Sequence, residues 1–110
     1  MTPQEKTELY EMLLQRANRP GTFTAVNGLR VTSVGDGCAQ GEVDLTDAHL
    51  NPLGIVHGGV YSTMMDQVAG AAACSRGSMC RTVDCEVRFF APAAGTKIYS
   101  HAQAIRMGVG

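Results

Sequence analysis

The residues best suited to chemistry lie close together, between Asn51 and Asp66. A His57-Gly58-Gly59 turn leads into an apolar stretch that carries one carboxylate, Asp66. A charged group in such a stretch is costly to bury unless it has a partner or a task. The N-terminus of a helix presents unpaired N–H groups and the positive end of the helix dipole. A helix that begins at Gly58 therefore offers an amide to a carbonyl oxygen that gains negative charge, and the glycines let that carbonyl approach closely.

Asp66 lies too far along the predicted helix to act on the carbonyl held at its N-terminus. At a rise of about 1.5 Å per residue, the two positions are roughly 10–12 Å apart along the axis. A second subunit with its helix antiparallel to the first would place its own Asp66 near the first subunit's Gly58. We therefore expect the site to lie between two chains.

One carboxylate beside a helix N-terminus suits the cleavage of a thioester. A thiol with a pKa of about 8.5 leaves easily, so the reaction needs oxyanion stabilisation and a base or nucleophile but little acid catalysis. The sequence contains neither the Gly-x-Ser-x-Gly elbow of serine hydrolases nor the P-loop of phosphoryl transfer.

The composition is typical of one small globular domain. The 110 residues are 45% hydrophobic and 17% charged, with a formal net charge of -1. We predict a single domain over residues 1–110, with an N-terminal helix and linker at 1–21 and the core at 22–110. The near-neutral charge and scarce aromatics argue against nucleic acid as a partner, and no apolar run is long enough to span a membrane.

The cysteines indicate the redox compartment. Cys38, Cys74, Cys80 and Cys85 form no C-x-x-C pair and have no neighbouring histidine at zinc-ligand spacing. Together with the lack of a signal-peptide pattern, this predicts free thiols in the cytoplasm, with a structural disulfide as the alternative. We predict no metal and no cofactor.

The predicted elements place the candidate helix among strands. Thr2-Pro3-Gln4-Glu5 is a capping box that starts a helix, which should end near Asn18 to Gly21. From Thr22 the pattern becomes β-type, and two runs around the turn Gly35-Asp36-Gly37 predict an antiparallel hairpin. The helix from Val60 is apolar on most of its circumference, which predicts burial on several sides.

Two further strands are predicted after that helix. Residues 81–90 and 97–106 alternate between apolar and polar side chains, as half-buried strands do. Four strands around one buried helix would leave an exposed sheet edge, which natural domains usually cover or pair.

The order of these features resembles a known family. Asn51, His57-Gly58-Gly59 and Asp66, then Thr82-Val83-Asp84 and Phe89-Phe90-Ala91-Pro92-Ala93, resemble the hotdog-fold acyl-CoA thioesterases of the phenylacetate-degradation (PaaI) type. The likeness spans about residues 25–107. It implies an α+β hotdog fold, with an antiparallel sheet wrapped around a central α-helix, and self-association as a homodimer or homotetramer. Family members usually carry two more strands after the run that ends near Arg106, and we expect the sequence as given to lack them.

The resemblance also implies roles for individual residues. Gly58 would polarise the thioester carbonyl of an acyl-CoA through its amide, and Asp66 of the partner chain would be the general base or the nucleophile. Asn51 and His57 would orient substrate or water, and Thr82 would hold that water. The wall of the substrate site would include Gly59, Tyr61 and Met65.

Simpler interpretations of the same residues stay open. His57 can cap the turn, Asn51 can form an Asx turn, and Tyr61, Met64 and Met65 can belong to the core. His49 is expected to be solvated or bonded locally, and His101 to lie on the surface of a strand. For the whole chain, the alternative function is a non-catalytic acyl-thioester-binding or regulatory module, and a hotdog dehydratase is a weaker third possibility.

Overall fold

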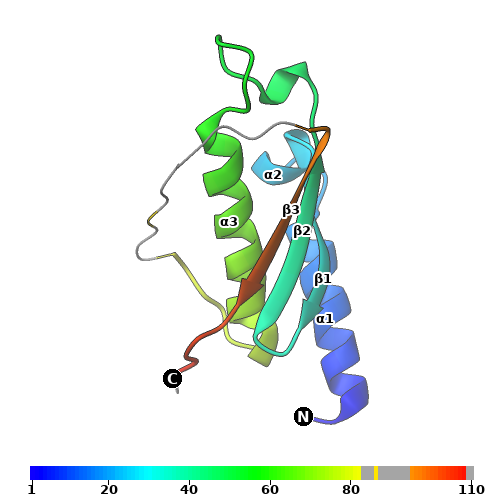
Figure 1. Cartoon of the computed structure of the whole chain (residues 1–110). Coiled ribbons are helices and arrows are strands. Elements are labelled where there is room, and N and C mark those ends of the chain that lie inside the picture. The colour runs from blue at the N-terminus through cyan, green and yellow to red at the C-terminus, as the bar shows by residue number, and fades with distance from the viewer. Residues whose placement is uncertain (83–85, 87–94, 109–110) are drawn as a thin grey trace.

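The computed structural model describes residues 1–82, 86 and 95–108. One long helix lies against a three-stranded antiparallel sheet of order β1-β2-β3, and a second long helix lies along β1 (Figure 1). The sheet and the central helix agree with the predicted α+β architecture. The helical elements and strands are α1 Pro3–Ala17, α2 Phe23–Val26, β1 Leu29–Gly35, β2 Cys38–Asp44, η1 Asp47–His49, α3 Gly58–Ala73, η2 Cys74–Arg76 and β3 Lys97–Gln103.

The capping box at the start of α1 is confirmed. The Thr2 hydroxyl accepts a hydrogen bond from the Glu5 N–H, and the Glu5 carboxylate accepts one from the Thr2 N–H, both at 3.1 Å. The bond from the Thr2 N–H to the Glu5 carboxylate lowers the pKa of Glu5, and the Thr2 side chain lowers it further. At the other end of α1, the Asn18 side chain bonds both the N–H and the carbonyl of Val31 in β1, each at 2.8 Å. Asn18 thus takes the place of a neighbouring strand at this point.

The segment after Thr22 differs from its prediction. We expected β-type structure there, but Phe23–Val26 forms the short helix α2, in which the Val26 N–H bonds the Thr22 carbonyl at 2.9 Å. Phe23 and Val26 are largely exposed, so no buried face selects a strand at this point. Asn27 then closes the helix by donating from its side chain to the Phe23 carbonyl at 2.7 Å.

The predicted hairpin and the last strand are present. Gly35 pairs with Cys38 around a two-residue turn, in which Gly37 has a φ of 70°. β3 covers Lys97–Gln103 of the predicted run 97–106, and its residues alternate between half-buried and exposed as expected. His101 is exposed on this strand, as predicted. The predicted strand at 81–90 falls almost wholly outside the described residues.

The core forms where α3 crosses β2. The largest of its fully buried side chains are Val43, Met64 and Val68. Gly41 permits this contact, since a Cβ there would lie 2.7 Å from Val68 Cγ2 and 2.9 Å from the Arg30 carbonyl oxygen. The absence of a side chain at Gly41 therefore fixes how closely α3 approaches the sheet.

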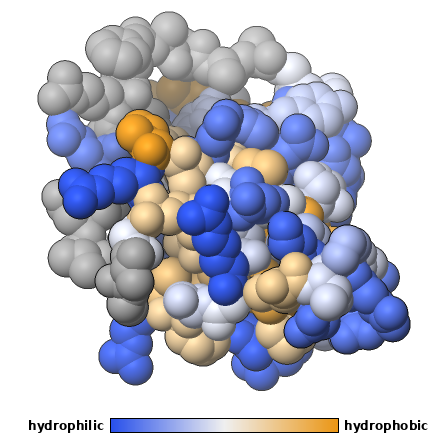
Figure 2. Space-filling model, turned by 90° about the horizontal axis from the view of Figure 1, so that it is seen from below, coloured by the Kyte–Doolittle hydropathy of each residue, from blue (hydrophilic) through white to orange (hydrophobic). Residues whose placement is uncertain are grey.

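At the C-terminal end of α3, a hollow opens between the helix and β3. Its walls are mainly small side chains of both elements and of the residues after β3, among them Ala69, Ala72, Ala102 and Ala104, with two arginines, Arg76 and Arg106. Figure 2 shows this end of the molecule, where moderately hydrophobic surface lies beside strongly hydrophilic side chains. This hollow contains none of the predicted site residues.

Candidate active site

The loop that leads into α3 is a closed hairpin-like turn. The His57 N–H bonds the His49 carbonyl at 2.8 Å, Leu50 and Val56 form an antiparallel bridge, and the Asn51 N–H bonds the Ile55 carbonyl at 2.7 Å. These contacts hold residues 49–57 in one conformation. The first residue after the loop is Gly58, where α3 begins.

Asn51 organises the tip of this loop. Its side-chain oxygen accepts hydrogen bonds from the N–H groups of Leu53, at 2.9 Å, and Ile55, at 3.3 Å. Asn51 therefore forms an Asx turn through its side-chain oxygen, as the simpler interpretation predicts. The side-chain amide nitrogen of Asn51 has no hydrogen-bond partner within the described residues, so it remains available to donate to a bound carbonyl or water.

His57 caps α3. Its Nδ1 accepts the Gly59 N–H at 2.8 Å, and its carbonyl accepts the Val60 N–H at 3.0 Å. A Cβ at Gly59 would lie 2.9 Å from His57 Nδ1, so glycine is needed for this cap. In the neutral ring an accepting Nδ1 leaves the proton on Nε2, so His57 can donate from Nε2 to a ligand.

The cap does not use the first amide of the helix. Gly59 and Val60 donate to His57, whereas the Gly58 N–H has no acceptor among the residues that the structure describes. The predicted oxyanion donor is thus an amide without an acceptor in the described part of the chain. Because it lies at a helix N-terminus, the dipole favours negative charge beside it.

Asp66 lies two turns further along α3 and has a partner. The Thr82 hydroxyl donates a hydrogen bond to Asp66 Oδ1, so the structure brings together two predicted site residues that are 16 positions apart. Asp66 itself is exposed. The bond orients a carboxylate that faces solvent rather than the core.

Two adjoining hollows connect these groups. One, at the start of α3, is lined by His49, His57, Gly59 and neighbouring residues. The other is lined by Asp66, Thr82 and residues of α1 and α3. Both have Phe23 and Thr63 in their walls. The two hollows thus lie next to each other beside α3, and about 12 Å of helix separates Gly58 from Asp66.

Tyr61, Met64 and Met65, which the sequence left open as core residues, differ in how deeply they are buried. Met64 is fully buried in the core, whereas Met65 is 43% exposed, so the core interpretation of Met65 is wrong. Tyr61 is half-buried. Met65 and Asp66 lie next to each other on the exposed side of α3, where a second subunit can reach them.

Sequence reasoning missed the most highly connected residue near the site, His49. We expected a solvated or locally bonded side chain. The local bond to Thr46 is present, but His49 is only 7% exposed and also bonds the Asn27 backbone carbonyl, 22 positions away. The nearby Asp47 and Thr46 signalled the turn, but no sequence signal points to Asn27.

Two features of the described residues concern metal binding and membrane insertion. No group of three or more histidine, cysteine or acidic side chains in the described part of the chain is arranged to bind a metal ion. None of the helices in residues 1–82 and 95–108 has the length and apolar character needed to cross a membrane.

The chain matches a family model in sequence and several solved structures in fold. The family model of the thioesterase superfamily matches residues 53–109. No curated protein matches the sequence. Among solved structures, conserved protein PA5202 from Pseudomonas aeruginosa is 25% identical, with a TM-score of 0.77 over 84% of this chain and 77% of that one. A putative esterase, Rv1847/MT1895, from Mycobacterium tuberculosis is 28% identical, with a TM-score of 0.72 over 79% of this chain and 73% of that one.

The fold is shared with a further structure, the PaaI protein from the phenylacetic acid degradation operon of E. coli. It is 22% identical, with a TM-score of 0.77 over 91% of this chain and 75% of that one. Since the family match covers more than half of the chain, the chain belongs to the thioesterase superfamily. The predicted hotdog fold and the resemblance to thioesterases of the PaaI type are confirmed. This membership supports thioester hydrolysis as the general activity.

Proposed function

We propose that this protein hydrolyses acyl-CoA thioesters, with aryl or medium-chain acyl groups, to the free acid and CoA. The observation that carries the proposal is the Gly58 amide at the N-terminus of α3, which has no acceptor among the described residues and lies beside a histidine cap that uses the next two amides. A donor that is already in place needs no reorganisation when the carbonyl oxygen gains charge.

The reaction needs a second group at the same carbonyl, which the partner subunit supplies. Asp66 lies about 12 Å from Gly58 along one helix, beyond the reach of a single thioester carbonyl. In a homodimer, or in a homotetramer built from such dimers, antiparallel α3 helices would bring Asp66 of one chain to Gly58 of the other. The exposed Met65 and Asp66 provide the surface for that contact.

The residues then have complementary roles. Asp66 acts either as a general base, taking a proton from the water that attacks the carbonyl carbon, or as a nucleophile whose acyl intermediate water then hydrolyses. In both cases the C–S bond breaks and CoA leaves as the thiolate. Thr82 orients the Asp66 carboxylate, Gly58 stabilises the oxyanion, and Asn51 and His57 donate from Asn51 Nδ2 and His57 Nε2 to substrate or water. Gly59 and Tyr61 border the acyl group.

Steady-state hydrolysis of benzoyl-, phenylacetyl-, hexanoyl- and acetyl-CoA tests the proposal. Replacing Asp66→Asn removes the base or nucleophile while keeping a group that accepts from Thr82, and we expect kcat to fall by about 10²–10⁴-fold. Asp36→Asn, which changes an exposed carboxylate on the distant β1–β2 turn, is the matched control.

Two results would contradict the enzymatic proposal. Asp66→Asn with the turnover of the wild type would remove the assigned residue from the reaction. Wild-type protein that binds acyl-CoA but cleaves none of the four thioesters would instead support the non-catalytic acyl-thioester-binding module.

A further inference from the structure

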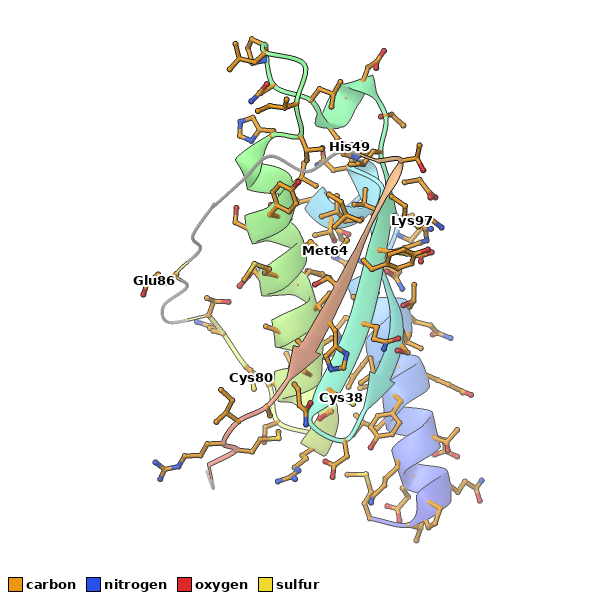
Figure 3. The ribbon with its side chains drawn as sticks, in the orientation of Figure 1. Cys38, His49, Met64, Cys80, Glu86 and Lys97 are labelled. Carbon is orange, nitrogen blue, oxygen red and sulfur yellow. The ribbon has the colours of Figure 1, made fainter. Side chains whose placement is uncertain are left out.

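The ring of His49 joins two parts of the chain at the end of the sheet where α3 begins (Figure 3). Its Nδ1 lies 3.0 Å from the Thr46 backbone nitrogen, and its Nε2 lies 2.6 Å from the Asn27 carbonyl oxygen. An amide N–H only donates and a carbonyl only accepts, so the ring is neutral with its proton on Nε2. Both ring nitrogens of this buried side chain are therefore in use.

The backbone of the same residue holds the start of the catalytic helix. The His49 carbonyl accepts the His57 N–H at 2.8 Å, and the Leu50–Val56 bridge follows it. One residue thus connects Asn27, two positions before β1, with His57, the residue directly before Gly58. The path from Asn27, which caps the end of α2, to the residue before Gly58 consists of one short side-chain bond and one backbone bond.

We propose that His49 is a positioning residue, whose bond to Asn27 fixes where the Gly58 amide lies relative to the sheet. For catalysis this rests on the proposed function, since the Gly58 amide matters only if it binds the oxyanion. His49 also lines the hollow that contains His57 and Gly59. Small displacements of an oxyanion donor weaken catalysis strongly, because the donor must lie about 3 Å from the developing charge.

Two substitutions that introduce an amide side chain distinguish the two hydrogen bonds of the His49 ring. In His49→Asn, the side-chain oxygen replaces Nδ1 and can accept from Thr46, but the shorter side chain does not reach Asn27. In His49→Gln, the longer side chain places an N–H near the position of Nε2 and can restore the bond to Asn27. The pair therefore tests the bond to Asn27 against the bond to the local turn at Thr46.

The experiment combines kinetics with the amide signal of Gly58 in ¹H–¹⁵N NMR spectra. For His49→Asn we expect kcat to fall about ten- to a hundredfold with KM changed less than about threefold, and the Gly58 signal to shift and exchange faster with solvent. For His49→Gln we expect kcat within about threefold of the wild type and a Gly58 signal close to the wild-type position.

Several results would overturn the proposal. One is a Gly58 signal that stays at its wild-type position in His49→Asn, and another is a kcat for that variant equal to that of the wild type. If His49→Asn does not fold, as judged by its thermal denaturation, His49→Gln decides alone. If the Gly58 signal of His49→Gln moves away from its wild-type position, or if kcat is lost while Tm stays unchanged, the positioning role of His49 is refuted. Wild-type protein without thioesterase activity would instead refute the proposed function, while the NMR shifts would still test the positioning of Gly58.

Discussion

The substitution Gly58→Pro removes the Gly58 N–H, which is the proposed oxyanion donor. Gly58 is the first residue of α3, where proline is well tolerated because its φ suits the helix and no intrahelical bond is lost. The preceding His57 has φ -63° and ψ 134°, the extended conformation that a residue before proline requires. The variant should therefore fold, with a change in the free energy of unfolding of less than about 1 kcal/mol.

The cost to catalysis follows from the hydrogen bonds around this amide. The Gly59 and Val60 N–H groups already donate to His57, so neither is free to replace the lost donor. Loss of one oxyanion donor lowers kcat by about 10²–10³-fold, which corresponds to about 2.7–4 kcal/mol. We expect a decrease in this range.

Gly58→Ala is the matched control, because it also adds a Cβ but keeps the N–H. Comparing the kcat of the two variants isolates the amide, and circular dichroism with thermal denaturation shows whether both are folded. A Gly58→Pro variant that retains kcat within about threefold of Gly58→Ala would refute the assignment of this amide as the oxyanion donor.

Two further predictions concern stability. Gly41→Ala should lower the free energy of unfolding by about 1–3 kcal/mol, because its Cβ would meet both a core side chain and a backbone carbonyl. Gly70→Ala, in α3 with no atom within 4 Å of the added Cβ, should leave stability unchanged or raise it by up to about 1 kcal/mol; urea titrations at one protein concentration check both, and equal stabilities would contradict the packing argument. Arg76 lowers the pKa of Asp36 through a hydrogen bond and its charge, so their ion pair stabilises the fold at neutral pH and this contribution is lost as the pH falls through that lowered value. The Tm difference between wild type and Asp36→Asn should therefore be small at pH 7 and vanish once the pH lies below the lowered pKa of Asp36, and a difference that grows on acidification would contradict this sign.

Local signals in the sequence predicted most of the elements around the site. The capping box at Thr2 and the turn at Gly35 to Gly37 each depend on residues a few positions apart. The start of α3 at Gly58 was likewise visible, since a histidine and two glycines before an apolar run indicate a helix N-terminus. Such features are predictable because the interacting groups are neighbours in the chain.

The features that were missed depend on partners far away in the sequence. The bond from His49 to Asn27 ends on a backbone carbonyl, a group that every residue carries, so nothing in the sequence marks the acceptor. The segment Phe23–Val26 has residues that favour strands, but a short helix forms because the large side chains Phe23 and Val26 remain exposed and Asn27 caps its end. The pairing of Thr82 with Asp66 required the fold to bring the end of one segment back to α3.

The central claim is that each active site takes Gly58 from one chain and Asp66 from another, and mixed oligomers test it directly. Gly58→Pro and Asp66→Asn chains, each with its own affinity tag, are mixed under conditions that allow subunits to exchange, and hydrolysis is compared with that of each variant alone. In a mixed dimer one site has both defects, and the other combines an intact Gly58 with an intact Asp66. Random mixing should restore about a quarter of wild-type turnover. Mixed oligomers, isolated by both tags, that show no more activity than the two variants measured separately would contradict a site shared between chains.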